Sequence, residues 1–170
     1  MRVNLYPAPV PSRLGSIPSG DAGVRATLKA MAGLVKQYKT DAGINTLALQ
    51  ITHGVASYDK AGEITALQHF VRDRITYRQD VEGVETLRTP VKTLQVAAGD
   101  CDDKSVLLDT LLATIGFKVM FFAIGLNGQP FSHVLAGVRV GTRTIPLETI
   151  VPGAEPGWMP PATSVFPWNV

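Results

Sequence analysis

The sequence predicts an α+β fold, in which a helical lobe and a helix beginning at the single cysteine pack against a small antiparallel β-sheet. Up to residue 115, apolar residues recur at the spacing of amphipathic helices. Beyond Gly116 the pattern changes to short runs rich in β-branched and aromatic residues. At 170 residues, the chain is long enough for one good core and too short for two ordinary domains.

The first half of the chain predicts three amphipathic helices in series. They span Asp21 to about Tyr38, Ile44 to about Tyr58, and Glu63 to Ile75, and a polar loop and a short helix at 91–96 follow them. We expect these helices to buttress the helix that carries the cysteine. Three lysines fall on the polar face of the first helix, and we expect them to form solvated surface: Lys29, Lys36 and Lys39.

The only cysteine lies where a loop turns into a helix. Asp100 is a good N-cap, and Asp103 stands three residues later, where the acid of a capping box belongs. Cys101 therefore falls in the first turn, where backbone N–H groups and the helix dipole stabilise a thiolate. The alternative is that Cys101 is a small buried hydrophobic residue. The helix continues with one apolar stripe, which includes Val106, Leu107, Leu108, Leu111, Leu112 and Ile115.

Three strand-like segments follow the Cys101 helix, at residues 117–124, 133–140 and 143–148. If the last two are adjacent and antiparallel, His133 and Glu148 can be cross-strand neighbours on one face. The carboxylate then bonds one ring nitrogen of His133 while the other nitrogen faces Cys101. A cysteine, a base and an acid that orients the base are the groups that thiol catalysis requires.

The sequence resembles the transglutaminase-like superfamily of papain-type cysteine enzymes in three segments, GDCDDKSVLLDTLL, SHVLAGV and IPLET, and in the preceding run ITYRQDVEGVETLRTPVKTLQVAAGDCDD. The resemblance covers Ile64 to Trp158 and is strongest to bacterial and bacteriophage members, including cysteine proteases with Gly-Asp-Cys-Glu-Asp at the nucleophile. It implies a papain-like core with Cys101 as nucleophile, His133 as base and Glu148 as orienting acid. The family usually has aspartate at this third position, so Glu148 departs from the pattern by one methylene.

A glutamine precedes the cysteine at a suggestive spacing. Gln95 stands six residues before Cys101, where papain-like enzymes place the glutamine that donates to the oxyanion. The alternative is a solvated glutamine, in which case the backbone N–H of Cys101 is the remaining oxyanion donor.

The acids beside the cysteine pose an electrostatic problem. Asp100, Asp102 and Asp103 favour the helix start, but their negative charges disfavour a thiolate. Clustered carboxylates are also ligands that calcium prefers, and related bacterial proteases resemble this chain in using calcium near the nucleophile. We therefore hypothesise calcium at these aspartates; no cofactor is required. The alternative is that the acids only cap the helix and pair with basic side chains.

The composition excludes several classes of protein. The net charge of +2 gives no argument for nucleic-acid binding. One cysteine permits no intramolecular disulfide and no multi-cysteine zinc site, and the three histidines are scattered without ligand spacing. Prolines interrupt the N-terminal apolar residues, so no signal peptide or membrane span is predicted. We expect the protein in the host-cell cytoplasm or associated with a virion.

The domain expected from the sequence spans residues 21–150. Residues 1–20 form an extended Pro-rich arm, and residues 151–170 form a Pro/Gly-rich tail with Trp158, Phe166 and Trp168. The aromatic side chains of the tail either pack onto the domain or form a protein-binding strip. Such flaps would suit contacts with other virion proteins.

Two functions are therefore predicted. The first is a cysteine-dependent hydrolase or acyl-transferase, protease-like, that acts on protein or peptide amides. The second is a bacteriophage virion or assembly component on a transglutaminase-like scaffold, with weak or no catalysis.

Overall fold

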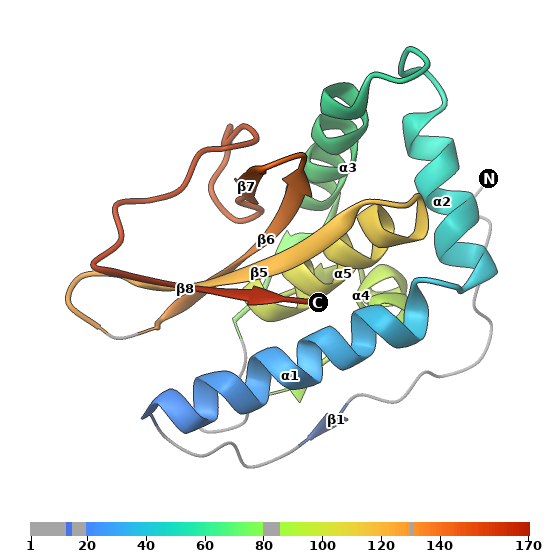
Figure 1. Ribbon diagram of the computed structural model, residues 1–170. Helices are drawn as coiled ribbons and strands as arrows, with labels where there is room; N and C mark the ends of the chain where they lie inside the picture. Colours follow the sequence, from blue (N-terminus) through green and yellow to red (C-terminus); the bar gives the residue numbers. More distant parts are fainter. Residues whose placement is uncertain (1–12, 15–19, 80–85, 130) are drawn as a thin grey trace.

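The fold is described from a computed structural model, which describes residues 13–14, 20–79, 86–129 and 131–170 (Figure 1). Apart from Arg13, Leu14 and Gly20, the predicted arm at residues 1–20 lies outside the described residues. The predicted α+β class is confirmed, because helices fill the first two thirds of the described chain and an antiparallel sheet follows.

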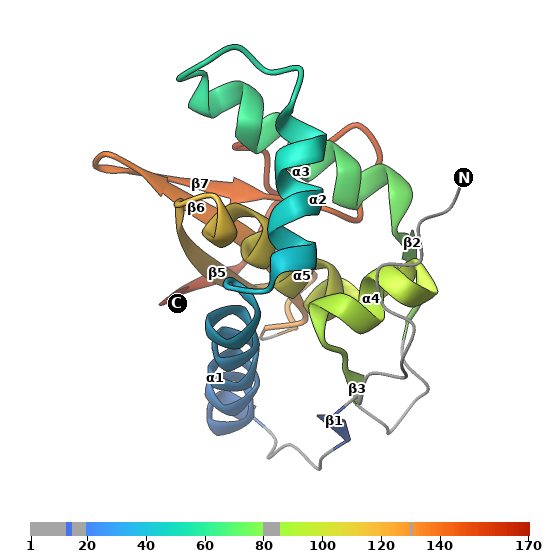
Figure 2. The same ribbon diagram turned by 90° about the vertical axis from the view of Figure 1, so that its right-hand side faces the viewer.

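Helix α5 (Cys101–Thr114) is the central element of the fold. It contacts helices α1 (Gly20–Tyr38), α2 (Ala42–Thr52), α3 (Lys60–Arg74) and α4 (Pro90–Val96) as well as the sheet (Figure 2). Every residue from Asp103 to Leu112 is buried. The prediction of a single apolar stripe was therefore wrong for this helix, because neighbours surround it on all sides.

The helices of the lobe begin close to the predicted caps. The carboxylate of Asp41 accepts a hydrogen bond from the Ile44 N–H at 3.0 Å, as expected of an N-cap. Helix α2 ends at Thr52 and not near Tyr58 as predicted. A turn follows it, and Tyr58 adopts a left-handed backbone with φ 65°, which a helix does not permit.

The main sheet has the strand order β7-β6-β5-β8, with every neighbouring pair antiparallel. Strands β5 (Lys118–Gly125), β6 (His133–Val140) and β7 (Arg143–Leu147) follow the predicted segments. Strand β8 (Ser164–Asn169) was not predicted, because the sequence indicated only an irregular tail over residues 151–170. It pairs with β5, with Phe121 opposite Trp168.

The two faces of the sheet are covered by different parts of the chain. One face, with Phe121 and Val138, packs into the same core as α5. A second cluster of Met120, Phe122, Ile124 and Leu135 lies under Met159 and Ala162 of the C-terminal segment. The aromatic residues of β8, Phe166 and Trp168, pack against the main core. Trp158, which precedes β8 in the C-terminal segment, is 41% exposed.

Two pairs of very short strands complete the fold. Strand β1 (Arg13–Leu14) pairs antiparallel with β3 (Thr86–Leu87), and β2 (Thr76–Tyr77) pairs in parallel with β4 (Ala98–Gly99). The second pair joins the end of α3 to the residues just before Cys101. Among the described helices, none combines the length and apolar character that crossing a bilayer requires.

Candidate active site

The start of α5 places Cys101 at the first helical position. The Asp100 side chain accepts a hydrogen bond from the Asp103 N–H at 3.0 Å, so the predicted N-cap is confirmed. The first N–H groups of a helix have no partner within the helix, so that of Cys101 is a candidate donor to an oxyanion.

Gly99 allows strand β4 to approach α5 closely. A Cβ atom on Gly99 would lie 2.6 Å from the Cβ of Asp103, which is too close for any side chain. The parallel pairing of β4 with β2 then sets Tyr77 beside Gly99, and the Arg78 N–H donates to the Gly99 carbonyl at 3.0 Å. Tyr77 is thereby brought to the cysteine from 24 residues upstream.

The thiol of Cys101 lies in an environment that favours its protonated form. Burial raises the pKa of the Cys101 thiol well above its ordinary value, and the nearby carboxylates of Asp102 and Asp100 raise it further. Its Sγ donates to Oδ1 of Asp102 at 3.4 Å. A backbone hydrogen bond from Val134, the residue after His133, acts in the opposite direction and lowers the pKa.

His133 and Glu148 form a short, buried contact. The Nε2 atom of His133 lies 2.7 Å from Oε2 of Glu148, whose side chain is 1% exposed. The other carboxylate oxygen accepts the Ile150 N–H at 2.6 Å, and Gln68 donates to the Glu148 carbonyl at 2.8 Å. Burial raises the pKa of Glu148, but the hydrogen bond and charge of His133 and the N–H groups of Ile150 and Val151 lower it further, leaving it below its ordinary value.

The structure brings two further ionisable residues, Tyr77 and Lys104, to this region. The pairing of β2 with β4 places Tyr77 opposite Gly99, and burial, followed by the charges of Cys101 and Asp100, raises the pKa of its phenol. The sequence did not predict this position of Tyr77, because the two-residue parallel pairing that sets it has no sequence signal.

Lys104 lies one helical turn beyond Cys101 and is 1% exposed. Its Nζ donates to the carbonyls of Ile75 at 2.7 Å and Arg72 at 3.3 Å. Burial lowers its pKa to about 8, although the charges of Glu148 and Asp73 act to raise it. Lys104 therefore links the C-terminal end of α3 to α5, and its positive charge attracts Glu148.

Asp103 pairs with a basic side chain, which is one of the two alternatives that the sequence predicted for these acids. It is fully buried, its Oδ1 accepts the Arg88 N–H at 2.7 Å, and its Oδ2 pairs with the Arg88 guanidinium. The predicted pairing of these acids with basic side chains is therefore confirmed for Asp103, whose carboxylate anchors β3 and α4 to α5 through Arg88.

The three aspartates do not fit a shared calcium ion. Both oxygens of Asp103 are occupied by Arg88, and Asp100 caps the helix. Over the residues that the structure describes, no group of three or more His, Cys, Asp or Glu side chains is arranged to hold a metal ion.

Gln95 is half-buried in the last turn of α4. Its role as an oxyanion donor stays a prediction. The other two histidines lie away from the thiol: His53 is exposed after α2, and His69 bonds Glu155 at 3.0 Å on the surface of α3.

Comparisons with known proteins support the fold. A "putative cysteine protease" from Cytophaga hutchinsonii superposes with a TM-score of 0.57 over 83% of this chain at 13% identity. A "putative protease" from Parabacteroides distasonis superposes with a TM-score of 0.56 over 73% at 14% identity. This chain spans 56% and 26% of those proteins, respectively. No protein-family model and no curated protein matches the sequence. The chain thus shares an α+β fold with these two proteins.

Proposed function

We propose that this chain is a cysteine-dependent hydrolase or acyl-transferase of the transglutaminase-like class that acts on protein or peptide amides. The observation that carries this proposal is the buried 2.7 Å contact between His133 and Glu148. The contact uses Nε2, so the remaining ring nitrogen, Nδ1, is the atom available to exchange a proton with the thiol of Cys101.

The proposed reaction begins when His133 Nδ1 takes the proton of Cys101 and the sulfur attacks the amide carbonyl carbon. The oxygen of the tetrahedral intermediate accepts a hydrogen bond from the Cys101 N–H. The C–N bond then breaks, His133 returns the proton to the departing amine, and a thioester remains. Water or a second amine attacks the thioester and releases the thiol.

The high pKa of Cys101 affects the timing of proton transfer in this proposal. Because burial, and then the charges of Asp102 and Asp100, raise the pKa of the thiol, a stable thiolate is disfavoured before substrate binds. Proton transfer to His133 therefore accompanies attack on the carbonyl. Glu148 stabilises the imidazolium at that moment.

A second function, a scaffold with weak or no catalysis, is favoured by the thiol itself. The Sγ atom donates to Asp102, and its raised pKa is typical of an unreactive cysteine. This alternative includes the predicted virion component, and those partners and that location stay predictions.

Alkylation by iodoacetamide at pH 7.5 and hydrolysis of a fluorescently labelled casein distinguish the two functions. The enzyme requires that His133→Ala slows both reactions at least about tenfold and that Cys101→Ser abolishes both. The exposed His53→Ala is the matched control and leaves both rates unchanged. Slow alkylation that His133→Ala does not alter, without casein hydrolysis, favours the scaffold.

A further inference from the structure

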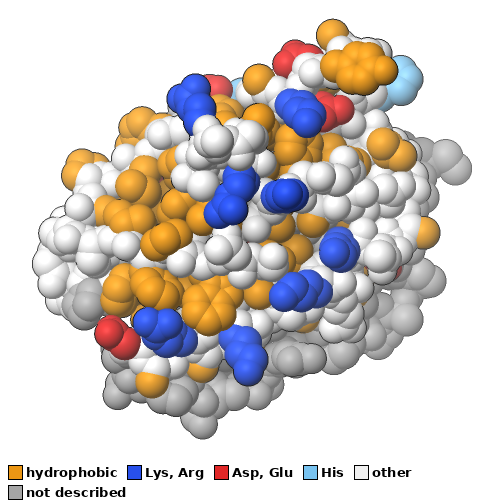
Figure 3. All heavy atoms as spheres, in the orientation of Figure 1, with side chains coloured by type: hydrophobic (Ala, Val, Ile, Leu, Met, Phe, Trp, Pro, Cys, Tyr) orange, Lys and Arg blue, Asp and Glu red, His pale blue; other side chains and the backbone are white. Residues whose placement is uncertain are grey.

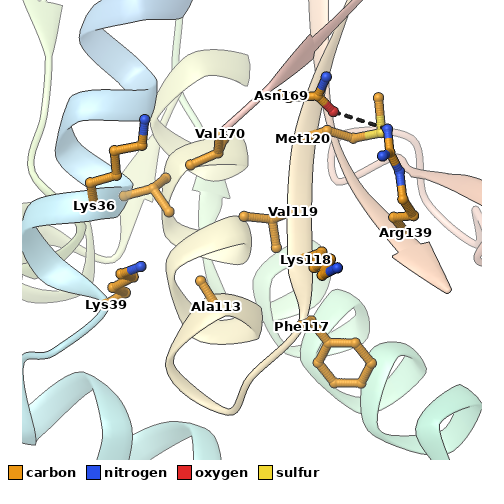
Figure 4. A pocket seen from close by; sticks show the side chains of 11 residues that line it. Lys36, Lys39, Ala113, Phe117, Lys118, Val119, Met120, Arg139, Asn169 and Val170 are labelled. Atoms are coloured by element: carbon orange, nitrogen blue, oxygen red, sulfur yellow. Dashed lines mark hydrogen bonds between the residues drawn. The ribbon is translucent and has the colours of Figure 1, made fainter. Parts of the chain in front are cut away.

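A cavity of about 420 Å³ lies on the side of the molecule where the C-terminal ends of α1 and α5 meet the sheet (Figure 4). Part of its lining is apolar and includes Val35 of α1, Ala113 of α5 and Val119 of β5. This volume suits one large apolar side chain and its neighbours.

Basic side chains lie at the margin of this apolar lining. Lys36 and Lys39 come from the last turn of α1 and the residue after it, and Lys118 comes from β5. Arg139 of β6 lies opposite Lys118 in the sheet and donates to Asn169 at 3.1 Å. No aspartate or glutamate lines the cavity, and within the described part of the chain no ion pair neutralises the three lysines.

The same face in space-filling view shows Lys and Arg side chains across its middle, among exposed hydrophobic side chains, with Asp and Glu toward its margins (Figure 3). Lys36 and Lys39 are exposed, as predicted, but the sequence does not show that the end of α1 lies beside β5 and Lys118. The fold brings Lys36 and Lys39 at the end of α1 and Lys118 at the start of β5 to the margin of one apolar hollow, whereas Arg139 lies on the other side of β5 (Figure 4).

The cavity is far from Cys101. Cys101 and Ala113 lie at opposite ends of α5, which at about 1.5 Å per residue separates them by roughly 18 Å. On the sheet, His133 pairs with Ile124 at one end of β5, and Arg139 pairs with Lys118 at the other end. The cavity is therefore a second site.

We propose that this cavity, together with the basic side chains at its margin, binds an acidic peptide segment of a partner protein. One apolar side chain of the segment occupies the hollow, and flanking carboxylates lie beside Lys36, Lys39 and Lys118. Complementary charge and an apolar anchor together favour such a segment. A nucleic-acid backbone would satisfy the cations but leave the apolar lining without a partner.

The test uses a fluorescein-labelled peptide of eight glutamates around one central phenylalanine, with binding measured by fluorescence anisotropy at 0.1 M salt. We expect saturable binding that weakens at least about tenfold in the double variant Lys36→Glu, Lys118→Glu, since two attractions become repulsions. The control Lys60→Glu, Arg74→Glu makes the same change of net charge on exposed residues of α3 and retains the wild-type affinity.

A second pair of measurements tests the apolar anchor and the class of partner. Replacing the phenylalanine of the peptide by serine weakens binding several-fold, and Val170→Ser, at the edge of the cavity, removes most of that difference. The proposal is overturned if both double variants lose the same amount of affinity for the peptide. It is also overturned if a 20-base-pair duplex DNA binds at least as tightly as the peptide. Because Cys101→Ser leaves this site intact, binding is measured in that variant and is independent of the proposed catalysis.

Discussion

The imidazole Nε2 of His133 lies 2.7 Å from the Oε2 of Glu148, although the side chain of Glu148 is one methylene longer than the aspartate expected from the resemblance. Glu148 follows the last residue of β7, and its second oxygen is held by the Ile150 N–H at 2.6 Å. The extra methylene is thus accommodated by a turn just beyond the strand, which holds the carboxylate in place.

Glu148→Gln tests this contact. We expect kcat/KM for labelled casein to fall roughly 10²- to 10⁴-fold, because a neutral amide no longer stabilises the imidazolium. Glu148→Asp gives a smaller loss, since the shorter side chain cannot reach both His133 and the Ile150 N–H. Glu155→Gln, which alters the exposed pair between Glu155 and His69, is the control and keeps wild-type kinetics. Equal activity in Glu148→Gln and wild type rules out the proposed role.

Glu148 also makes stability depend on acid pH. Its pKa is lower in the folded protein than its ordinary value of 4.5, so its stabilising contribution is complete above that value and is lost as pH falls through the folded pKa. Urea unfolding between pH 6 and pH 3 therefore shows a steeper loss in wild type than in Glu148→Gln. Parallel curves for the two proteins would contradict this prediction.

Asp102→Asn is expected to make the thiol more reactive. The variant removes a negative charge beside Sγ, which lowers the pKa of Cys101 and shifts the alkylation profile toward lower pH. The rate of iodoacetamide modification at pH 7.5 should rise several-fold. Asp73→Asn, on an exposed aspartate of α3, is the control and leaves the profile in place. A profile that does not move in Asp102→Asn would show that this carboxylate has little influence on the sulfur.

Asp103→Ala should destabilise the fold by about 2–4 kcal/mol, because it leaves the partly buried guanidinium of Arg88 and its N–H without their acceptor. Asp73→Ala breaks a pair on a half-exposed carboxylate and should cost less than about 1 kcal/mol. Urea denaturation measures both.

Calcium at millimolar concentration is expected to leave the Tm of wild type unchanged, and a rise in Tm that Asp102→Asn abolishes would restore the calcium hypothesis.

Lys104 makes stability depend on alkaline pH, in the same direction as Glu148 does at acid pH. Its pKa is about 8 in the folded protein against an ordinary value of 10.5, so between these values the unfolded chain binds more protons. The contribution of Lys104 to the free energy of unfolding therefore rises with pH across that window, by on the order of 3 kcal/mol. Stability relative to Lys104→Met should increase from pH 7.5 to pH 9.5. The exposed Lys60→Met is the control, and an identical pH slope in wild type and Lys104→Met would count against the prediction.

The sequence by itself determined the local structure around the candidate site. The cap at Asp100, the helix from Cys101 and the strand beginning at His133 depend on contacts within a few residues, so local patterns reveal them. The contact between His133 and Glu148 was also predicted, from the period of two neighbouring strands, although Glu148 lies just beyond the end of β7 and is not directly opposite His133.

Only the tertiary structure decided which distant groups share an environment. Tyr77 reaches Cys101 through a two-residue parallel pairing, Arg88 occupies Asp103, and β8 closes the sheet from a segment whose composition indicated a tail. The raised pKa of Cys101 and the grouping of Lys36 with Lys118 have the same origin. Burial and charge depend on distances in space, and chain packing sets those distances for residues that are far apart in sequence.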